Sequence, residues 1–374
     1  MSYRLIRNTL TVATVALLLG SAGSAQQAAA GKPSKGNTDH KARQQRPIQL
    51  GVSGGNSGDL ANGYCCSGTL GALVTNGTQQ FILSNTHVFA GDAVLGGNGK
   101  VAAAGDDINQ SGLIDVGCQV VSGDMVADLT SWAVFGAGNV DAAIALVRPG
   151  MVSTDGSILE IGPLASTTAQ AFVGQGVKKS GRTTGFTRSS VSGLNATITV
   201  GYTDECAGGS FNVTYTGQIL ISNRASRFLD SGDSGSLMVE DVATNPRAVG
   251  LLYAGSTSIA VANPINDVLN YFNVSMVGGA SSMGDSTPAE SGPASRKGLA
   301  AAIAAQERNS RALLNVPGAI GHAVSNGNSP VIKILVQEIT PRAQAAAPRQ
   351  VDGVPVILEE VGVVKGMPFC SKRK

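Results

Sequence analysis

The sequence predicts a mainly β protein that carries a small α+β module at its C-terminal end. Glycine makes up 49 of the 374 residues, which favours tight turns and short strands over long helices. Between residues 48 and 275, short β-rich runs are separated by glycine or Asn-Gly turns, and no stretch shows a convincing helical period until a short one at its end. After about residue 294 the pattern changes to an alanine-rich segment. Many short strands with glycine turns are typical of a sandwich or a barrel.

The first 30 residues have the features of a secretory signal peptide. Arg4 and Arg7 precede an apolar stretch, residues 10–19, that is too short to be a convincing membrane span. Small residues follow it, and we expect cleavage near residues 24–30. An uncleaved anchor is the alternative. After cleavage the protein would be secreted or periplasmic, with no stable membrane anchor.

Two segments have the composition of linkers. Residues 31–47 are polar, basic and unpatterned, and we expect His40 within them to have no chemical role. Residues 276–294 are rich in Gly, Ser and Pro. Residues 48–275 between them are long enough for a single catalytic unit.

The charge follows the same division of the chain. Residues 1–47 carry seven basic and one acidic residue, residues 48–275 carry nine and 17, and residues 276–374 carry eleven and seven. An acidic body between basic ends is a poor nucleic-acid binder, because phosphate contacts need clustered Lys and Arg on the folded surface. Three histidines and the lack of paired CxxC motifs argue against a metal site.

Strands are predicted along the whole of residues 48–275, and one short helix ends the unit. The helix is expected at residues 265–272, directly after Pro264. The expected strands are 69–74, 80–83, 142–147, 196–200, 218–221, 236–239 and 248–252.

The C-terminal module, residues 295–374, is predicted to contain a helix followed by three strands. Ser295 is a candidate N-cap for the alanine-rich helix. Two strands are joined through residues 326–328, and VDGVPVILEEVG supplies the third. We interpret His322 as an ordinary strand histidine. The sequence does not decide whether the module binds a partner, covers a cleft or assists folding.

Three segments carry the residue types needed for nucleophilic catalysis. His87 follows an apolar strand, Asp141 opens another, and Ser234 lies in DSGDSGSLMV. A serine hydroxyl is a weak nucleophile until a base takes its proton, and histidine titrates near neutrality and can take it. A buried carboxylate fixes the tautomer of the imidazole. Glycine at 232 allows backbone N–H groups to point at a developing oxyanion.

Alternatives exist for two members of this set. Ser57, in GGNSG, is a second candidate serine, but it precedes His87 in the chain. The aspartates that compete with Asp141 as the third member are Asp115, Asp124, Asp128 and Asp155.

The ordered set of motifs resembles chymotrypsin-fold, trypsin-like serine proteases. The order His, Asp, Ser is theirs, and SNTHV, DAAIAL and GDSGS stand where the family has its conserved segments. SGTLGALV, KSGRTTG, VGLLYAGS and ANPI look most like bacterial relatives of the plant narrow-leaf trypsin-like protease. The resemblance covers residues 48–275 and implies two antiparallel barrels that divide near residues 150–165.

The resemblance also implies the function. It implies a serine endopeptidase that needs no cofactor and acts on a protein or peptide substrate. The N–H groups of Gly232 and Ser234 would hold the oxyanion, and the substrate backbone would pair near Tyr253, Ala254 and Gly255. A catalytically silent binding or scaffold protein with the same fold is the alternative. The sequence leaves the oligomeric state open.

The chain departs from the family at three positions near the proposed site. Val88 replaces the cysteine beside the catalytic histidine, and Tyr253 stands where the family often has a small serine. Phe228 takes the position, six before the nucleophile, that floors the specificity pocket in trypsin-like enzymes. No carboxylate is evident there, so Phe228 would either floor a shallow apolar pocket or block it.

Arg182 in SGRTTG has a predicted partner. By resemblance to bacterial members, its guanidinium would pair with Asp233, a role that a freed N-terminus plays in animal trypsins. The alternative is an exposed charge on a loop.

The five cysteines are too few for a disulfide scaffold, and their odd number leaves at least one free or paired outside the chain. Cys65 or Cys66 could pair with Cys118, but the sequence does not show the pairing.

Overall fold

In the computed structural model the chain from Asp39 onward forms one compact unit, and residues 1–38 are a separate unit. The predicted signal peptide lies outside the described residues, apart from Met1. Within the part of the chain that the structure describes, no helix is long and apolar enough to cross a membrane. The structure describes residues 1, 38–60, 63–91, 101–203, 210–224, 227–279, 293–326, 329–366 and 368–372.

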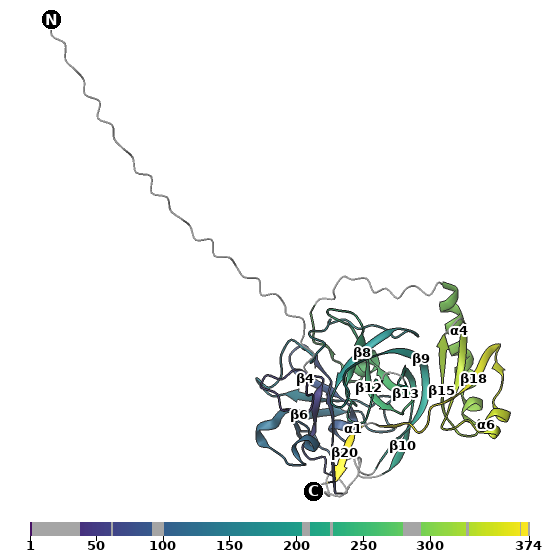
Figure 1. Cartoon of the computed structure of the whole chain (residues 1–374), viewed down its shortest axis with the longest axis horizontal. Helices are drawn as coiled ribbons and strands as arrows, with labels where there is room; N and C mark the ends of the chain where they lie inside the picture. The colour runs from purple at the N-terminus through teal and green to yellow at the C-terminus, as the bar shows by residue number, and fades with distance from the viewer. Residues whose placement is uncertain are drawn as a thin grey trace. The chain divides into compact units, whose positions relative to one another are not determined.

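The first half of the compact unit is a closed antiparallel barrel (Figure 1). Its strands are β1 (Val52–Asn56), β2 (Tyr64–Leu70), β3 (Ala72–Thr75), β4 (Gln80–Ser84), β5 (Asp107–Asn109), β6 (Met125–Trp132) and β7 (Ala143–Val147). β2 and β3 are one strand bent at Gly71, so that β2 pairs with β1 while β3 pairs with β4. The pairings β4–β7, β7–β6, β6–β5 and β5–β1 complete the ring.

The second half is another closed antiparallel barrel. Its strands are β8 (Gly176–Gly181), β9 (Gly185–Tyr202), β10 (Phe211–Ser222), β11 (Leu237–Glu240), β12 (Ala248–Gly255) and β13 (Ile259–Pro264). Each pairs with the next around the ring β8–β9–β10–β13–β12–β11. The chymotrypsin-like double barrel expected from the sequence is therefore confirmed.

The predicted elements fall on observed ones. The predicted strands 80–83, 142–147 and 236–239 agree with β4, β7 and β11 to within about a residue. The predicted strand 69–74 instead spans the bend between β2 and β3, and β9, β10 and β12 are longer than expected. The helix α3 (Ile265–Phe272) has the predicted bounds. The expected division near residues 150–165 falls between the end of β7 and the start of β8.

The C-terminal module has the predicted order of a helix followed by strands, with further short elements. It contains α4 (Pro293–Arg308), α5 (Ser310–Leu314), β15 (Ala319–Asn326), β16 (Pro330–Val336), α6 (Pro341–Ala346), β17 (Gln350–Val351) and β18 (Val354–Glu360). β15 pairs with β9 of the second barrel, so the two sheets are continuous. A Cβ atom at Gly321 would lie 2.2 Å from the carbonyl oxygen of Thr197, so glycine is needed where these strands meet.

The final segment leaves the module and returns to the barrels. β19 (Lys365–Gly366) pairs with β12, and β20 (Phe369–Lys372) pairs with β2. In Figure 1 the yellow strand β20 lies against the barrels and not against the module. No sequence pattern had predicted these two strands.

Two disulfides join the described cysteines, Cys65 to Cys118 and Cys66 to Cys370. The first is one of the pairings left open by the sequence. Cys206 lies outside the described residues, so the prediction of an unpaired thiol stays a prediction.

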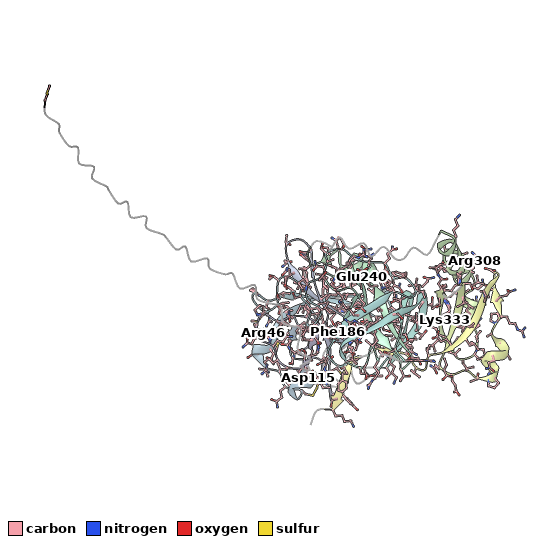
Figure 2. The ribbon with its side chains drawn as sticks, turned by 45° about the horizontal axis from the view of Figure 1, so that its top comes forward. Arg46, Asp115, Phe186, Glu240, Arg308 and Lys333 are labelled. Carbon is pink, nitrogen blue, oxygen red and sulfur yellow. A yellow bond between two sulfur atoms is a disulfide. The ribbon has the colours of Figure 1, made fainter. Side chains whose placement is uncertain are left out.

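The linker prediction for residues 31–47 is wrong for the part from Asp39. His40 is buried, with Nδ1 2.9 Å from the carbonyl oxygen of Gly51 and Nε2 2.7 Å from the carboxylate of Glu160. Arg43 pairs with the buried Asp124 at 2.6 Å, and Arg46, labelled in Figure 2, donates to the carbonyl oxygen of Gln110. The polar residues of this segment thus bind the first half of the compact unit, although several of them remain exposed.

Candidate active site

The imidazole of His87 and the carboxylate of Asp141 form a buried hydrogen-bonded pair. His87 lies in the short helix α1 (Thr86–Phe89), which follows β4, and Asp141 lies just before β7. Because β4 and β7 are paired, with Ser84 opposite Ala143, the ends of the two strands bring the side chains together. Nδ1 of His87 is 2.5 Å from Oδ2 of Asp141. This carboxylate can fix the imidazole with Nε2 free to accept a proton.

Tyr202, at the end of β9, binds the same carboxylate oxygen of Asp141 as the imidazole does. Its hydroxyl donates to Oδ2 of Asp141 at 2.7 Å and lies 2.8 Å from the hydroxyl of Tyr215. Burial beside the negative charge of Asp141 raises the pKa of Tyr202 well above its usual value, so the phenol stays neutral and donates. Sequence reasoning missed this residue, because Tyr202 lies in no recognisable motif.

Ser234 lies in a tight loop that β2 holds in place. The backbone N–H of Thr69 donates to the carbonyl oxygen of Ser234, and the Thr69 hydroxyl donates to that of Gly232. Gly232 and Gly235 have φ angles of +96° and +91°, which favour glycine. A Cβ atom at Gly71 would lie 1.9 Å from the carbonyl oxygen of Gly235, so the bend between β2 and β3 also gives the loop its space.

Two amide groups of this loop are available for an oxyanion. The N–H groups of Asp230, Ser231, Asp233 and Gly235 all donate to acceptors within the chain. Those of Gly232 and Ser234 have no acceptor among the described residues. Unpaired N–H groups in this loop are the kind of donor that an oxyanion hole uses.

The hydroxyl of Ser234 does not contact the imidazole in this structure. It donates to the carbonyl oxygen of Tyr253 at 3.0 Å, and Nε2 of His87 has no hydrogen-bond partner in the described part of the chain. Both side chains are buried, with Ser234 0% and His87 1% exposed. The structure thus joins His87 to Asp141 but leaves the Ser234 hydroxyl on another acceptor.

The predicted ion pair between Arg182 and Asp233 is wrong. The guanidinium of Arg182 forms two hydrogen bonds with Asp115, of 2.8 Å and 2.6 Å; Asp115 is labelled in Figure 2. The carboxylate of Asp233 instead accepts from the backbone N–H groups of Thr183 and Thr184 and from the Thr184 hydroxyl. It also lies 3.4 Å from Nζ of Lys179. With these donors the Asp233 carboxylate needs no arginine.

Phe228 does not line the open pocket beside the loop. It is fully buried and packs in the core of the second barrel. A pocket of about 600 Å³ nearby is lined by the next residues, Leu229, Asp230 and Ser231, together with Gly255. Tyr253 and Ala254 are buried in β12 just before Gly255.

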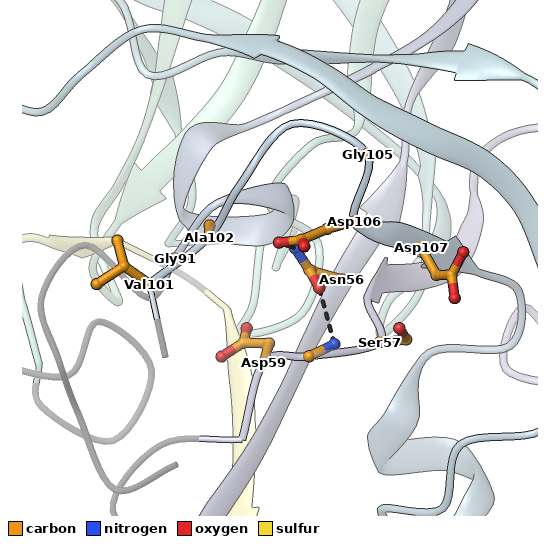
Figure 3. Close-up of a pocket in the computed structure, with 10 residues that line it drawn as sticks. Asn56, Ser57, Asp59, Gly91, Val101, Ala102, Gly105, Asp106 and Asp107 are labelled. Carbon is orange, nitrogen blue, oxygen red and sulfur yellow. Dashed lines mark hydrogen bonds between the residues drawn. The ribbon is translucent and has the colours of Figure 1, made fainter. Parts of the chain in front are cut away.

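The alternatives raised by the sequence have other surroundings. Ser57 lines a pocket with Asp59, Asp106 and Asp107, and neither His87 nor Asp141 contributes to it (Figure 3). The other candidate aspartates have their own partners: Asp115 binds Arg182, Asp124 binds Arg43, Asp128 binds Arg148, and Asp155 accepts from Ser153 and Ser157. In the described ranges, no group of three or more His, Cys, Asp or Glu side chains is placed to hold a metal ion.

Comparison with known proteins finds similarity only among solved structures. No family model and no curated protein matches the chain. A glutamic acid specific serine protease matches with a TM-score of 0.41 and 19% identity, over 61% of this chain and 100% of its own. Thermobifida fusca protease A matches at 0.38 and 20%, over 59% and 99%. Cellulomonas bogoriensis chymotrypsin matches at 0.36 and 19%, over 61% and 99%.

These structures are serine proteases of the chymotrypsin fold. Their similarity to this chain is too low to assign an activity to it. The function therefore has to be argued from the residues of the chain itself.

Proposed function

We propose that the protein is an exported serine endopeptidase that cleaves peptide bonds with Ser234 as nucleophile, His87 as base and Asp141 as the carboxylate that orients His87. The observation that carries the proposal is the buried His87–Asp141 pair at 2.5 Å, in a fold whose Ser234 loop leaves two amides unpaired. This combination supports a reaction in which negative charge develops on a carbonyl oxygen.

The proposed reaction proceeds through an acyl-enzyme. Nε2 of His87 accepts the proton of the Ser234 hydroxyl as Oγ bonds to the substrate carbonyl carbon, and the amides of Gly232 and Ser234 stabilise the oxyanion. His87 then gives the proton to the leaving amine, and water releases the acyl group by the same steps. The Ser234 side chain must first turn from the carbonyl of Tyr253 toward His87.

The proposed substrate is an extended peptide that pairs with β12 along Tyr253, Ala254 and Gly255. The two disulfides support a location outside the reducing cytoplasm, in agreement with the predicted signal peptide. Within the trypsin-like class, the segments SGTLGALV, KSGRTTG, VGLLYAGS and ANPI favour the bacterial relatives of the plant narrow-leaf protease.

A catalytically silent protein with this fold is the second candidate. The observation that favours it is the hydrogen bond of Ser234 to Tyr253, which leaves His87 without its partner. A fluorophosphonate probe distinguishes the two, because it reacts covalently only with an activated serine.

We expect the probe to label the full chain slowly. Labelling should be faster in Gly366→Val, a variant that removes the C-terminal segment from β12. Ser234→Ala should abolish labelling and peptide hydrolysis without changing the melting temperature much, since catalytic triad losses reach about 10⁶-fold in rate. Labelling that persists in Ser234→Ala would show that the nucleophile lies elsewhere. If neither the wild type nor Gly366→Val is labelled, the protein is silent.

A further inference from the structure

The free edge of β12 is occupied by the C-terminal segment of the chain itself. β11 pairs with β12 only as far as Leu251. Beyond that point, Gly366 pairs with Ala254 and Lys365 with Gly255, and the two segments run antiparallel. This is the edge on which the proposed function places the backbone of a peptide substrate.

The same segment then crosses to the first barrel. Phe369 pairs with Ser67 of β2, and Cys370 pairs with Cys66, to which it is also joined by a disulfide. A Cβ atom built on Gly232 would lie 3.1 Å from Cβ of Phe369, so the segment passes directly beside the oxyanion loop. β2 is the strand whose Thr69 holds the Ser234 loop.

Arg182 adds a third anchor. Its guanidinium lies over the ring of Phe369, 4.6 Å from the centroid, while it binds Asp115 of the first barrel. A cation over an aromatic face is attracted to it, and the effect grows when both groups are shielded from water. The segment is thus held by backbone pairing, by a disulfide and by Arg182.

The fit at the centre depends on a glycine. A Cβ atom at Gly366 would lie 2.7 Å and 2.8 Å from two ring carbons of Tyr202. The Tyr202 ring cannot move aside without breaking its hydrogen bonds to Asp141 and Tyr215. Only a residue without a side chain fits between β12 and this ring.

We propose that residues 365–372 are a resident substrate mimic that keeps the protease latent, and that the cleft accepts peptides with glycine at the position paired with Ala254. This inference rests on the proposed function. It gives the C-terminal module a role, since the module delivers the segment to the cleft. The 0% exposure of Ser234 agrees with a covered site.

Full-length variants test the latency. Gly366→Val should expel the segment through its clash with Tyr202, and Cys66→Ser/Cys370→Ser should release its far end. Each should raise the rate of fluorophosphonate labelling at least about tenfold, because the open fraction of the protein limits that rate. Cys65→Ser/Cys118→Ser is the matched control, because it removes a disulfide from β2 without releasing the C-terminal segment. Its labelling rate should stay at the wild-type value. Equal labelling of the wild type and both releasing variants would overturn the latency.

Hydrogen exchange gives a readout that does not need activity. In the wild type the amides through which residues 254–255 and 365–366 pair with each other should be protected, and in Gly366→Val these amides should exchange quickly. Fast exchange in the wild type would overturn the proposal even for a silent protein. If these amides are protected but the probe labels none of the variants, the result would reject the proposed function. It would still support the occupation of the β12 edge by residues 365–366.

A peptide added in trans tests the glycine preference. The peptide of residues 363–372, VVKGMPFCSK, should inhibit the labelling of Gly366→Val. The same peptide with valine at the position of Gly366 should inhibit at least about tenfold more weakly. Equal inhibition by the two peptides would show that Tyr202 does not select glycine.

Discussion

The hydroxyl of Tyr202 donates to Oδ2 of Asp141, the same oxygen that Nδ1 of His87 contacts. The sequence resemblance places Tyr253 where the family often has a small serine near this carboxylate. The hydrogen bond is instead supplied by Tyr202, from another strand. Tyr202 is therefore a positioning residue, which acts on the base through Asp141.

We predict that Tyr202→Phe lowers kcat and leaves KM nearly unchanged. Hydrogen bonds to charged groups contribute about 1.5–3 kcal/mol, which corresponds to roughly a 10- to 100-fold loss in kcat at about 1.4 kcal/mol per tenfold change. The measurement is steady-state peptide hydrolysis in the Gly366→Val background. Tyr215→Phe is the control, because the hydroxyl of Tyr215 contacts Tyr202 and not Asp141. Its loss in kcat should be smaller than that of Tyr202→Phe. A change confined to KM would contradict the positioning role.

The hairpin of β8 and β9 supports the Ser234 loop. Nζ of Lys179 is fully buried, 2.9 Å from the carbonyl oxygen of Gly185 and close to the hydroxyl of Thr184 and the carboxylate of Asp233. Burial lowers the pKa of Lys179, and the carboxylate of Asp233 opposes that change. Removing one partner of such a pair leaves a buried charge uncompensated.

We predict that Lys179→Met lowers the free energy of unfolding by about 3–5 kcal/mol and also slows probe labelling, because the Ser234 loop loses its support. The measurement is urea unfolding of the full chain. Arg188→Met, which breaks an exposed ion pair with Asp241 on the same hairpin, is the control and should cost at most about 1 kcal/mol. If the two variants unfold at the same urea concentration, the buried pair does not stabilise the hairpin.

The C-terminal module and the barrels are joined through β15, and His322 lies at that junction. Its Nδ1 is 2.8 Å from the amide nitrogen of Gln306, and its Nε2 is 2.7 Å from the hydroxyl of Ser310. Burial lowers the pKa of His322 from 6.5 to about 4. As predicted from the sequence, it is a structural strand histidine.

We predict that this residue makes the whole molecule sensitive to acid. Above pH 6.5 His322 is neutral in both states, and as the pH falls toward 4 only the unfolded chain takes up the proton. The free energy of unfolding should therefore fall by up to about 3 kcal/mol across this range. Urea unfolding at several pH values checks it. His322→Gln should show a weaker pH dependence, and an unchanged slope would exclude His322 as the cause.

The local features of the protein could be predicted from its sequence. Alternating strands with glycine turns, the helix at residues 265–272 and the order His87, Asp141, Ser234 are all written in short stretches of chain. The double barrel followed from the resemblance carried by those motifs. The strands and the helix depend on local backbone preferences, and the motifs depend on the few residue types that suit the proposed serine chemistry. Both can therefore be predicted without knowing which segments pack against them.

The contacts between distant segments could not be predicted from the sequence, because they depend on the complete fold. Arg182 binds Asp115 and not Asp233, because Thr183, Thr184 and Lys179 already satisfy the Asp233 carboxylate. The C-terminal strand pairs with β12 and β2, although nothing in KGMPFCSK marks it as a barrel strand. The partner of a charged side chain or of a strand edge is the group that the fold places close to it. That placement depends on the positions of all the other segments and not only on the residues that form the pair.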